Sequence, residues 1–482
     1  MINKIGTRNF NMLMGMVLFT IMIFLPAPAK MSASAWNVAA VTVLLAYWWS
    51  SEALPVPITS LLPIVLFPTL GVSSIGAATA PYAAPTIFLL MGGFIMATGL
   101  ARWNLHRRIA LMVLVRVGNN PTALIGGFMT VTALISMWIS NTASTLMMLP
   151  IALSLAGEII KEKSKKNAGF ILCLVLGIAY GANIGGFGTP IGTPPNLLVI
   201  AFMKENYGID VSFLSWMLFG VPATLVMLPI ACFVLTRWAF PFELDQNSVA
   251  QELLHQELNE MGPMSTPEKR MAYTFAFIAA LWIFRTPIQN NLGMMLWLSD
   301  ALISVFGAMI MFMIPAGSKE EQHATLLNWK TADTIPWGVL LLFGGGLSLA
   351  AAVKSSGLAV WIGNELGAIG TFDLIFIIFI LVSIVVFLTE LTSNTATTAT
   401  LLPILGALAV ATGLDPMILF VPVAISASCA FMLPVATAPN AVIYASGEVT
   451  IPQMAYAGFR VNLFAIIAIT SLSYFLVPII FG

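Results

Sequence analysis

Charged residues are scarce in this chain. Lys, Arg, Asp and Glu make up 8% of its 482 residues, whereas they make up about 25% of a typical soluble domain. Basic and acidic residues are equal at 20 each, so no excess of positive charge points to a nucleic-acid partner. Three cysteines dispersed among apolar segments exclude a disulfide framework and a cysteine metal cluster. What remains is a chain that is 59% hydrophobic, the composition of a polytopic membrane protein.

Long apolar runs recur along the whole chain and predict an all-α polytopic membrane protein with about eleven transmembrane helices plus two re-entrant hairpins. The first run follows Lys4 and Arg8 in the manner of a signal peptide, but we interpret it as a retained first crossing because many similar runs follow. The predicted crossings are 10–28, 35–51, 54–71, 82–101, 168–202, 213–235, 272–291, 295–314, 336–353, 416–446 and 457–481. The two predicted hairpins, 121–160 and 373–412, are interrupted by polar residues near their middles.

The placement of basic residues predicts the orientation, because loops on the cytoplasmic side of a membrane carry an excess of Lys and Arg. If the N-terminus is cytoplasmic and 121–160 does not cross, most basic clusters fall inside. These clusters are Arg102, Arg107 and Arg108, then Lys161, Lys163, Lys165 and Lys166, then Lys269 and Arg270. A full crossing at 121–160 would put the lysine cluster outside. We therefore predict a protein of the cytoplasmic (inner) membrane with a cytoplasmic N-terminus and an extracytoplasmic C-terminus.

A polar triplet occurs twice within the apolar hairpin segments. Ser140-Asn141-Thr142 is repeated 253 positions later (140 to 393) as Ser393-Asn394-Thr395. Leu149-Pro150 and Leu402-Pro403 repeat at the same spacing. Hydroxyl and amide groups at bilayer depth are costly unless they have partners. A polar site built twice therefore indicates a binding site made from two related halves.

Each triplet is followed by a segment that should break a membrane helix. The two segments are Gly192-Thr193-Pro194-Pro195-Asn196 and Ala436-Thr437-Ala438-Pro439-Asn440. Unwound backbone is tolerated at membrane depth only where it is buried in protein or lines a cavity. The helix N-termini that it creates suit an anion, and its free carbonyls suit a cation such as Na⁺. The crossings between the two copies give them opposite orientations, so the sequence predicts inverted-topology repeats, as in secondary transporters.

Two further polar features lie beside the triplets. Ser136 and Thr389 each stand four residues before a triplet, so each adds a hydroxyl on the same helix face. The alternative is that such hydroxyls only bond to a carbonyl one turn earlier. Glu390 is an acidic residue inside the predicted membrane, where the first copy has Met137. It is either a proton relay or a carboxylate that holds the hairpin backbone.

The paired Ser-Asn-Thr motifs, each followed by a Thr-x-Pro-Asn segment, resemble those of the divalent anion/sodium symporter family from about residue 36 onward. The resemblance implies a homodimer in which a transport domain moves past a scaffold by an elevator mechanism. The implied parts are a scaffold over 1–117, including an interfacial helix, and a transport part over 118–237. These are followed by a cytoplasmic loop over 238–271 and a second scaffold part over 272–371 with its own interfacial helix. The last is a second transport part over 372–482.

The resemblance also implies site residues. One sodium site would use Ser136, Ser140, Asn141 and the backbone of Gly192, and a second would use Thr389, Thr392, Asn394 and the backbone of Ala436. The substrate carboxylates would meet Asn141, Thr142 and Thr193 on one side and Asn394, Thr395 and Thr437 on the other. Some relatives have Ser at position 193 and Pro at position 438. These differences affect the shape of the pocket and leave the preferred anion open.

We therefore predict sodium-coupled import of a C4-dicarboxylate such as succinate, malate or fumarate. The predicted pocket holds no Lys or Arg, so co-transported Na⁺ would supply the positive charge. Moving two negative charges inward against 100 mV costs about 4.6 kcal/mol, from roughly 2.3 per charge. Sodium-independent dicarboxylate exchange, citrate or sulfate symport, proton coupling through Glu390 and an anion channel remain alternatives. No serine-hydrolase or metalloprotease motif supports an enzyme. The expected partners are thus the anion, sodium ions, the lipid bilayer and a second copy of the chain.

Overall fold

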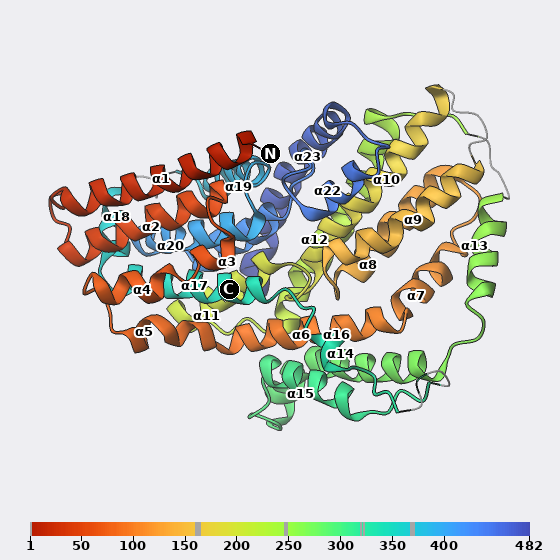
Figure 1. Ribbon diagram of the computed structural model, residues 1–482, viewed down its shortest axis with the longest axis horizontal. Coiled ribbons are helices and arrows are strands. Elements are labelled where there is room, and N and C mark those ends of the chain that lie inside the picture. Colours follow the sequence, from red (N-terminus) through yellow and green to blue (C-terminus); the bar gives the residue numbers. More distant parts are fainter. Residues whose placement is uncertain (1, 160–164, 245–248, 319–320, 322, 367–371) are drawn as a thin grey trace.

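A computed structural model shows a molecule built from helices (Figure 1). It describes residues 2–159, 165–244, 249–318, 321, 323–366 and 372–482. Within these ranges the only strand-like pairing is one isolated bridge between Pro315 and Thr325. The all-α fold predicted from the sequence is therefore confirmed. Lys161 and Lys163, on which the orientation argument partly rests, lie outside the described residues.

The part of the chain predicted as the first scaffold part contains two long helices, a run of short ones and then two more helices. Its bounds are α1 (Ile2–Phe24), α2 (Ala33–Ser51), α3 (Val56–Thr59), α4 (Leu62–Thr69), α5 (Ile75–Thr79), the 3₁₀ turn η1 (Ala80–Ala83), α6 (Pro85–Arg102) and α7 (Leu105–Leu114). The predicted crossing 54–71 is broken into α3 and α4. Pro57 and Pro63 explain the break, because proline cannot donate a helical hydrogen bond. Helix α7 occupies the place of the predicted interfacial helix.

The first hairpin and its broken crossing follow. The helices are α8 (Pro121–Ser136), α9 (Asn141–Ile159), α10 (Lys165–Gly185), the 3₁₀ turn η2 (Gly186–Gly188), α11 (Pro194–Tyr207), α12 (Phe213–Phe233) and the π-helical turn η3 (Val234–Ala239). Helix α8 begins sharply because Asn120 accepts from Thr122 N and Ala123 N. Crossing 168–202 is interrupted between α10 and α11, as the Gly and Pro residues there predict.

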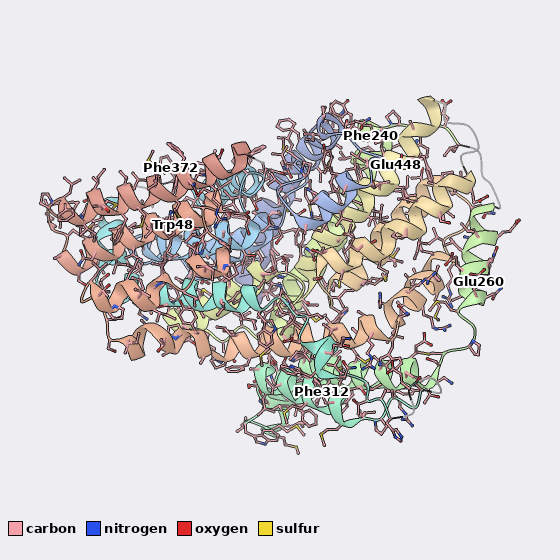
Figure 2. The ribbon with its side chains drawn as sticks, in the orientation of Figure 1. Trp48, Phe240, Glu260, Phe312, Phe372 and Glu448 are labelled. Carbon is pink, nitrogen blue, oxygen red and sulfur yellow. The ribbon has the colours of Figure 1, made fainter. Side chains whose placement is uncertain are left out.

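After η3 come α13 (Val249–Glu260) and then, over the predicted second scaffold part, α14 (Thr266–Leu292), α15 (Asp300–Met313), α16 (Trp329–Ala332), α17 (Trp337–Ser355) and α18 (Leu358–Leu366). Helix α13 lies within the segment 238–271, which the sequence argument treated as a loop. In Figure 1, α13 stands at the edge of the molecule, beside α7 and α9, and it contacts both. Figure 2 shows Glu260 at the end of this helix. Helix α18 lies where the second interfacial helix was predicted.

The last segment repeats the hairpin and broken crossing with α19 (Leu374–Thr389), α20 (Asn394–Thr412), α21 (Pro416–Ala427), α22 (Ala438–Ala445) and α23 (Ile451–Phe481). Large apolar side chains on its outer surface, such as Phe372 in Figure 2 at 63% exposure, suit contact with lipid. The segment between α21 and α22 is not helical, as the Ala436–Asn440 motif predicts.

Nine helices in the described part of the chain are long and apolar enough to cross a membrane. They include the second arm of each hairpin, α9 and α20, whereas the first arms α8 and α19 are shorter. The predicted crossings 54–71, 295–314 and 416–446 consist of shorter helices. The re-entrant character of the hairpins and the number of crossings stay predictions.

Glycine allows the helices of the first repeat to meet closely. A Cβ atom on Gly185 of α10 would lie 2.3 Å from Ala133 O of α8, and one on Gly181 would lie 2.6 Å from Met129 O. Only a residue without a side chain fits at such distances. This packing sets the end of α8, and therefore Ser136, against the point where α10 unwinds.

Candidate functional site

A cavity of about 510 Å³ lies where the two hairpin tips meet the two broken segments. Its wall contains all six residues predicted to bind substrate, namely Asn141, Thr142, Thr193, Asn394, Thr395 and Thr437. Phe94 of α6 and Thr334, Pro336 and Val339 near the start of α17 complete the wall from the scaffold segments. The structure thus gathers residues from both triplets, both broken segments and the predicted scaffold parts around one space.

The cavity wall combines polar and apolar side chains and, in the described part of the chain, carries no charged group. None of the residues that line it is Asp, Glu, Lys, Arg or His. Four helices begin at this wall, since Asn141, Pro194, Asn394 and Ala438 are the first residues of α9, α11, α20 and α22. Unpaired N–H groups and the positive end of the helix dipole lie at a helix N-terminus. An anion in the cavity would therefore be stabilised by dipoles rather than by a cationic side chain.

Oxygen atoms gather beside the first triplet. The Asn141 side-chain amide lies 2.6 Å from Ser136 Oγ, 3.2 Å from Gly192 O and 3.3 Å from Ala182 O. Turned one way, the amide nitrogen donates to all three oxygens. Turned the other way, the amide oxygen accepts from Ser136 Oγ and faces the two carbonyls with no hydrogen between them. Four oxygens in that arrangement match the environment of a hard cation. Ser140 lines the cavity next to this cluster, and its Oγ accepts from Ala143 N at 3.3 Å.

The second triplet has a matching cluster. Thr389 Oγ1 lies 2.7 Å from Asn394 Oδ1 and 2.7 Å from Ala427 O. Thr389 and Asn394 correspond to Ser136 and Asn141, and the Ala427 carbonyl lies beside them as the Ala182 carbonyl lies beside the first pair. Ala436, the counterpart of Gly192, lines the cavity. In each half the hydroxyl and the asparagine predicted to bind sodium are therefore in contact, Ser140, Gly192 and Ala436 line the adjoining cavity, and the Ala182 or Ala427 carbonyl, which sequence reasoning missed, lies beside the pair.

Thr392 is the exception among the predicted sodium residues. Its hydroxyl donates to Leu388 O at 2.9 Å and lies 2.5 Å from Thr397 Oγ1. The structure does not place this hydroxyl in the oxygen cluster of Thr389 and Asn394. It follows the alternative weighed for membrane hydroxyls, a bond to the carbonyl one turn earlier.

Each unwound segment is held by the asparagine that ends its motif. Asn196 Nδ2 donates to Gly186 O and Thr189 O, both at 2.8 Å. Asn440 Nδ2 donates to Ala430 O and Leu433 O, both at 3.0 Å. These four carbonyls correspond in pairs at a spacing of 244 positions (186 to 430 and 189 to 433). The internal symmetry therefore extends to individual hydrogen bonds.

The two repeats also contact each other directly. Asn183 Nδ2 of α10 donates to Ala430 O at 3.2 Å and to Thr437 Oγ1 at 3.3 Å, and Tyr180 OH donates to Phe431 O at 2.9 Å. The reverse contact, from Ser428 Oγ to Thr193 Oγ1, is longer at 3.5 Å. Sequence reasoning missed Asn183, although a buried amide in an apolar helix was a signal that could have found it.

Glu390 is buried at the tip of the second hairpin, with 3% of its surface exposed. Its carboxylate accepts from the backbone N–H groups of Phe431, Met432 and Leu433, at 2.7 to 3.2 Å, and from Asn462 Nδ2 at 2.7 Å. These contacts favour the interpretation that it holds backbone.

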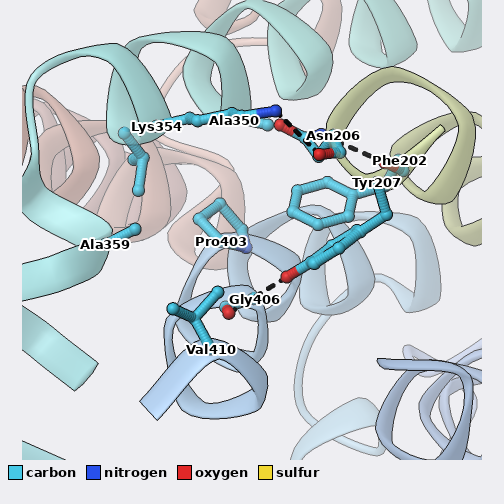
Figure 3. A pocket seen from close by; sticks show the side chains of 10 residues that line it. Phe202, Asn206, Tyr207, Ala350, Lys354, Ala359, Pro403, Gly406 and Val410 are labelled. Atoms are coloured by element: carbon cyan, nitrogen blue, oxygen red, sulfur yellow. Dashed lines mark hydrogen bonds between the residues drawn. The ribbon is translucent and has the colours of Figure 1, made fainter. Parts of the chain in front are cut away.

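A second cavity lies between the scaffold and the second half of the broken crossing (Figure 3). Scaffold residues Ala350 and Lys354 face Asn206, Pro403 and Gly406 of helices α11 and α20. Lys354 Nζ donates to Asn206 O at 2.7 Å, at the C-terminal end of α11. The contact joins a helix of the predicted scaffold to a helix of the predicted transport part.

Comparison with known proteins settles the family. The profile described as "Sodium:sulfate symporter transmembrane region" matches residues 6–480. The chain belongs to the sodium:sulfate symporter family. The resemblance to divalent anion/sodium symporters is thereby confirmed, and this symporter-family chain is a multi-pass membrane protein of a transporter family.

Relatives of this symporter-family chain match it over almost their whole length. It is 38% identical to the sodium-dependent dicarboxylate transporter SdcS of Staphylococcus saprophyticus over 495 residues, covering 100% of this chain and 94% of the relative. It is 39% identical to SdcS of Staphylococcus aureus strain USA300 over 476 residues, covering 98% and 91%.

Two solved structures share the fold. The YdaH transporter of Alcanivorax borkumensis superposes with a TM-score of 0.58 at 13% identity, covering 98% of this chain and 97% of that one. MtrF of Neisseria gonorrhoeae, described within a class of antimetabolite efflux pumps, gives a TM-score of 0.52 at 13% identity, covering 97% and 93%. At this identity the likeness concerns the fold alone.

Proposed function

We propose that this protein imports C4-dicarboxylates such as succinate, malate and fumarate together with Na⁺. The observation that carries the proposal is the uncharged cavity between two matching oxygen clusters. The close relatives are named sodium-dependent dicarboxylate transporters, which supports the same substrate class and coupling ion. The residues assigned to substrate are the six residues of the cavity wall, three from each half.

Two Na⁺ ions bind at the oxygen clusters in this proposal. The first contacts Ser136, Ser140, Asn141 and Gly192 O, and the amide oxygen of Asn141 turns toward the ion. The second contacts Asn394 and Ala436 O, with the Thr389 hydroxyl and Ala427 O beside them. Thr392 would contribute through its backbone, because its hydroxyl is bonded elsewhere. Amide, hydroxyl and carbonyl oxygens are the ligands that hard cations prefer.

The dicarboxylate binds between the ions. Each carboxylate accepts from the amide and hydroxyl groups of one half and faces helix N-termini of the same half. Because the cavity wall has no cationic side chain, the Na⁺ ions supply most of the positive charge. Substrate and sodium therefore each raise the affinity of the protein for the other.

The same charges explain why coupling is useful. Importing two negative charges against a 100 mV inside-negative potential costs about 4.6 kcal/mol, and each accompanying Na⁺ returns about 2.3 kcal/mol. Three Na⁺ ions reverse the sign of the transported charge. Dissipation of the sodium gradient then drives accumulation.

The movement proposed for this cycle is an elevator. The transport parts, 118–237 and 372–482, carry both oxygen clusters, and they also carry the two hairpin tips and the two broken segments that line the cavity. They move as a unit past the scaffold parts 1–117 and 272–371. We further propose a homodimer formed through the scaffold, in the cytoplasmic (inner) membrane, with the N-terminus cytoplasmic and the C-terminus extracytoplasmic. The cavity supports this division, because its wall combines residues of both parts.

The test is uptake of labelled succinate into proteoliposomes that contain the purified protein. An inward Na⁺ gradient should drive accumulation, and replacing Na⁺ with K⁺ or choline should abolish it. Equal uptake without sodium, dependent on internal dicarboxylate, would establish exchange instead. Current that increases with voltage without saturation would establish an anion channel.

The anion is identified in the same vesicles by competition. Unlabelled malate and fumarate should reduce succinate uptake at concentrations similar to that of unlabelled succinate. Stronger competition by citrate or sulfate would contradict the proposed substrate class while leaving sodium coupling intact.

A further inference from the structure

Glu390 is surrounded by hydrogen-bond donors. Backbone N–H groups of three consecutive residues, Phe431, Met432 and Leu433, point at its two carboxylate oxygens, and Asn462 Nδ2 adds a fourth donor. Successive backbone N–H groups that converge in this way form an anion-binding nest. Hydrogen bonds to an ionised acceptor are also roughly twice as strong as neutral ones. The hairpin tip therefore holds the unwound segment by a charged side chain.

The residues that Glu390 holds lie next to the second oxygen cluster. Leu433 donates its N–H to Glu390, and its carbonyl accepts from Ala436 N at 3.2 Å. Thr389, the neighbour of Glu390, donates to Ala427 O at the other end of the unwound segment. One turn of the hairpin tip thus fixes both Ala427 and Ala436 relative to Asn394.

The first repeat reaches the same result by a reversed arrangement. Thr189 occupies the position of Leu433, and its carbonyl accepts from Gly192 N at 3.3 Å. Its hydroxyl donates to Met137 O at the tip of the first hairpin. In the first half a side chain of the unwound segment binds the backbone of the tip, whereas in the second half a side chain of the tip binds the backbone of the unwound segment.

We propose that Glu390 is a positioning residue for the second cation site, where it holds residues 431–433 so that the carbonyls of Ala427 and Ala436 face Thr389 and Asn394. This inference rests on the proposed function, since it assumes that Na⁺ binds there. Glu390 remains an acceptor throughout the cycle and carries no proton to or from the substrate.

The decisive variant is Glu390→Gln, measured as initial succinate uptake in proteoliposomes over a range of sodium concentrations. The substituted amide nitrogen faces backbone donors and cannot accept from them. Loss of a residue that orients metal ligands typically weakens metal affinity about 10–100-fold. We expect the sodium concentration for half-maximal uptake to rise about tenfold, while the succinate KM at saturating sodium and the pH profile of uptake stay as in the wild type.

Glu448→Gln is the matched control. Glu448 lies in the loop between α22 and α23, away from the cavity wall (Figure 2), so its variant should keep the wild-type sodium dependence. Asn462→Leu removes one of the donors to Glu390 and leaves the backbone nest in place. It should produce a smaller rise in half-saturating sodium, and it provides the test if Glu390→Gln does not fold.

Three results would overturn the inference. A lost or shifted pH profile in Glu390→Gln would identify a proton relay. A lower maximal rate with unchanged sodium dependence would identify a purely structural role, and unchanged sodium dependence in Asn462→Leu would contradict the positioning role independently. Failure of the proposed function is distinct, because wild-type uptake would then already be independent of sodium.

Discussion

The two halves of the molecule are built from the same motif but are stabilised differently. In both halves a hydroxyl and an asparagine amide meet at a hairpin tip, at 2.6 Å for Ser136 and Asn141 and 2.7 Å for Thr389 and Asn394. The tip of the first half is tied by a neutral hydroxyl from Thr189, whereas that of the second is tied by the buried carboxylate of Glu390. The binding groups are thus duplicated, but the contacts that hold them have diverged.

The difference shows which parts of a duplicated site must be similar. Groups that face the shared cavity are restricted by one ligand, so both copies keep Asn and Thr there. Groups behind the wall need only fix the same backbone geometry, and that can be done by a donor in one element or by an acceptor in the other. The second half buries a carboxylate for this purpose, which is tolerable because three backbone N–H groups and the Asn462 amide donate to it.

The largest effect should come from the asparagines themselves. Asn141→Ala and Asn394→Ala each remove a proposed contact to both sodium and substrate. Loss of a residue that only orients metal ligands typically weakens metal affinity about 10–100-fold, and loss of a direct contact should weaken it more. We expect succinate uptake in proteoliposomes to fall by more than about 100-fold in either variant. Normal uptake in one of them would mean that the halves are not equivalent in binding.

The next largest effect concerns the two contacts that hold the hairpin tips, the Thr189 hydroxyl in the first half and the Glu390 carboxylate in the second. Thr189→Val removes the hydroxyl that reaches the first tip while preserving the shape of the side chain. We expect a rise of about tenfold in half-saturating sodium, similar to that proposed for Glu390→Gln, because both ties orient cation ligands. Sodium titrations of the two variants side by side check this. If half-saturating sodium rises in only one variant, the contact at the hairpin tip orients cation ligands in that half alone.

A smaller effect concerns the contacts between the halves. Asn183→Leu removes two hydrogen bonds between the repeats, to Ala430 O and Thr437 Oγ1, although both atoms keep a second donor in Asn440. At about 0.5–1.5 kcal/mol for each bond, the loss should cost about 1–3 kcal/mol of stability. Ser428→Ala removes a single contact between the repeats, the 3.5 Å one to Thr193, together with a 3.3 Å bond to Ala424 O one turn earlier, and should cost about 0.5 kcal/mol. Thermal unfolding of the detergent-purified variants would compare them, and equal destabilisation would contradict the asymmetry of the contacts.

The smallest effect should be at the scaffold contact. Lys354→Met removes the bond to Asn206 O, which as an exposed interaction is worth about 0.5 kcal/mol. That energy is enough for a roughly twofold shift between the conformation with this contact and one in which the transport part has moved away from the scaffold. The distance distribution between spin labels at Glu205 of α11 and Ser355 of α17 should show a larger fraction of molecules in which these two helices are separated. The control Lys204→Met breaks the Lys204–Asp210 pair (2.9 Å) inside the predicted transport part and should leave the distance distribution unchanged.

Much of the site could be predicted from sequence because its signals are local. Ser-Asn-Thr in an apolar run and Gly or Pro in a membrane helix each break the expected pattern, and their repetition marks two halves. The positions of Asn141, Thr193, Asn394 and Thr437 at one cavity follow from that symmetry. The breaks at Gly192 and Ala436 follow from the limits of proline and glycine in helices.

The remaining features depend on contacts between distant residues. The partners of Glu390 lie about 41 positions or more away in a segment without regular structure, so its local sequence could not distinguish a proton relay from a backbone tie. The family resemblance implied Thr392 as a cation ligand, but its hydroxyl bonds to Leu388 O and Thr397 Oγ1 instead. Asn183 reaches into the other repeat, and no periodic pattern within its own helix shows that.

The most direct test of two cation sites beside one anion is the initial rate of succinate uptake as a function of sodium concentration. We expect a sigmoidal dependence with a Hill coefficient above about 1, because at least two Na⁺ ions must bind with the substrate for transport. A hyperbolic dependence would reduce the site to one coupled cation. A rate independent of sodium would contradict the account altogether.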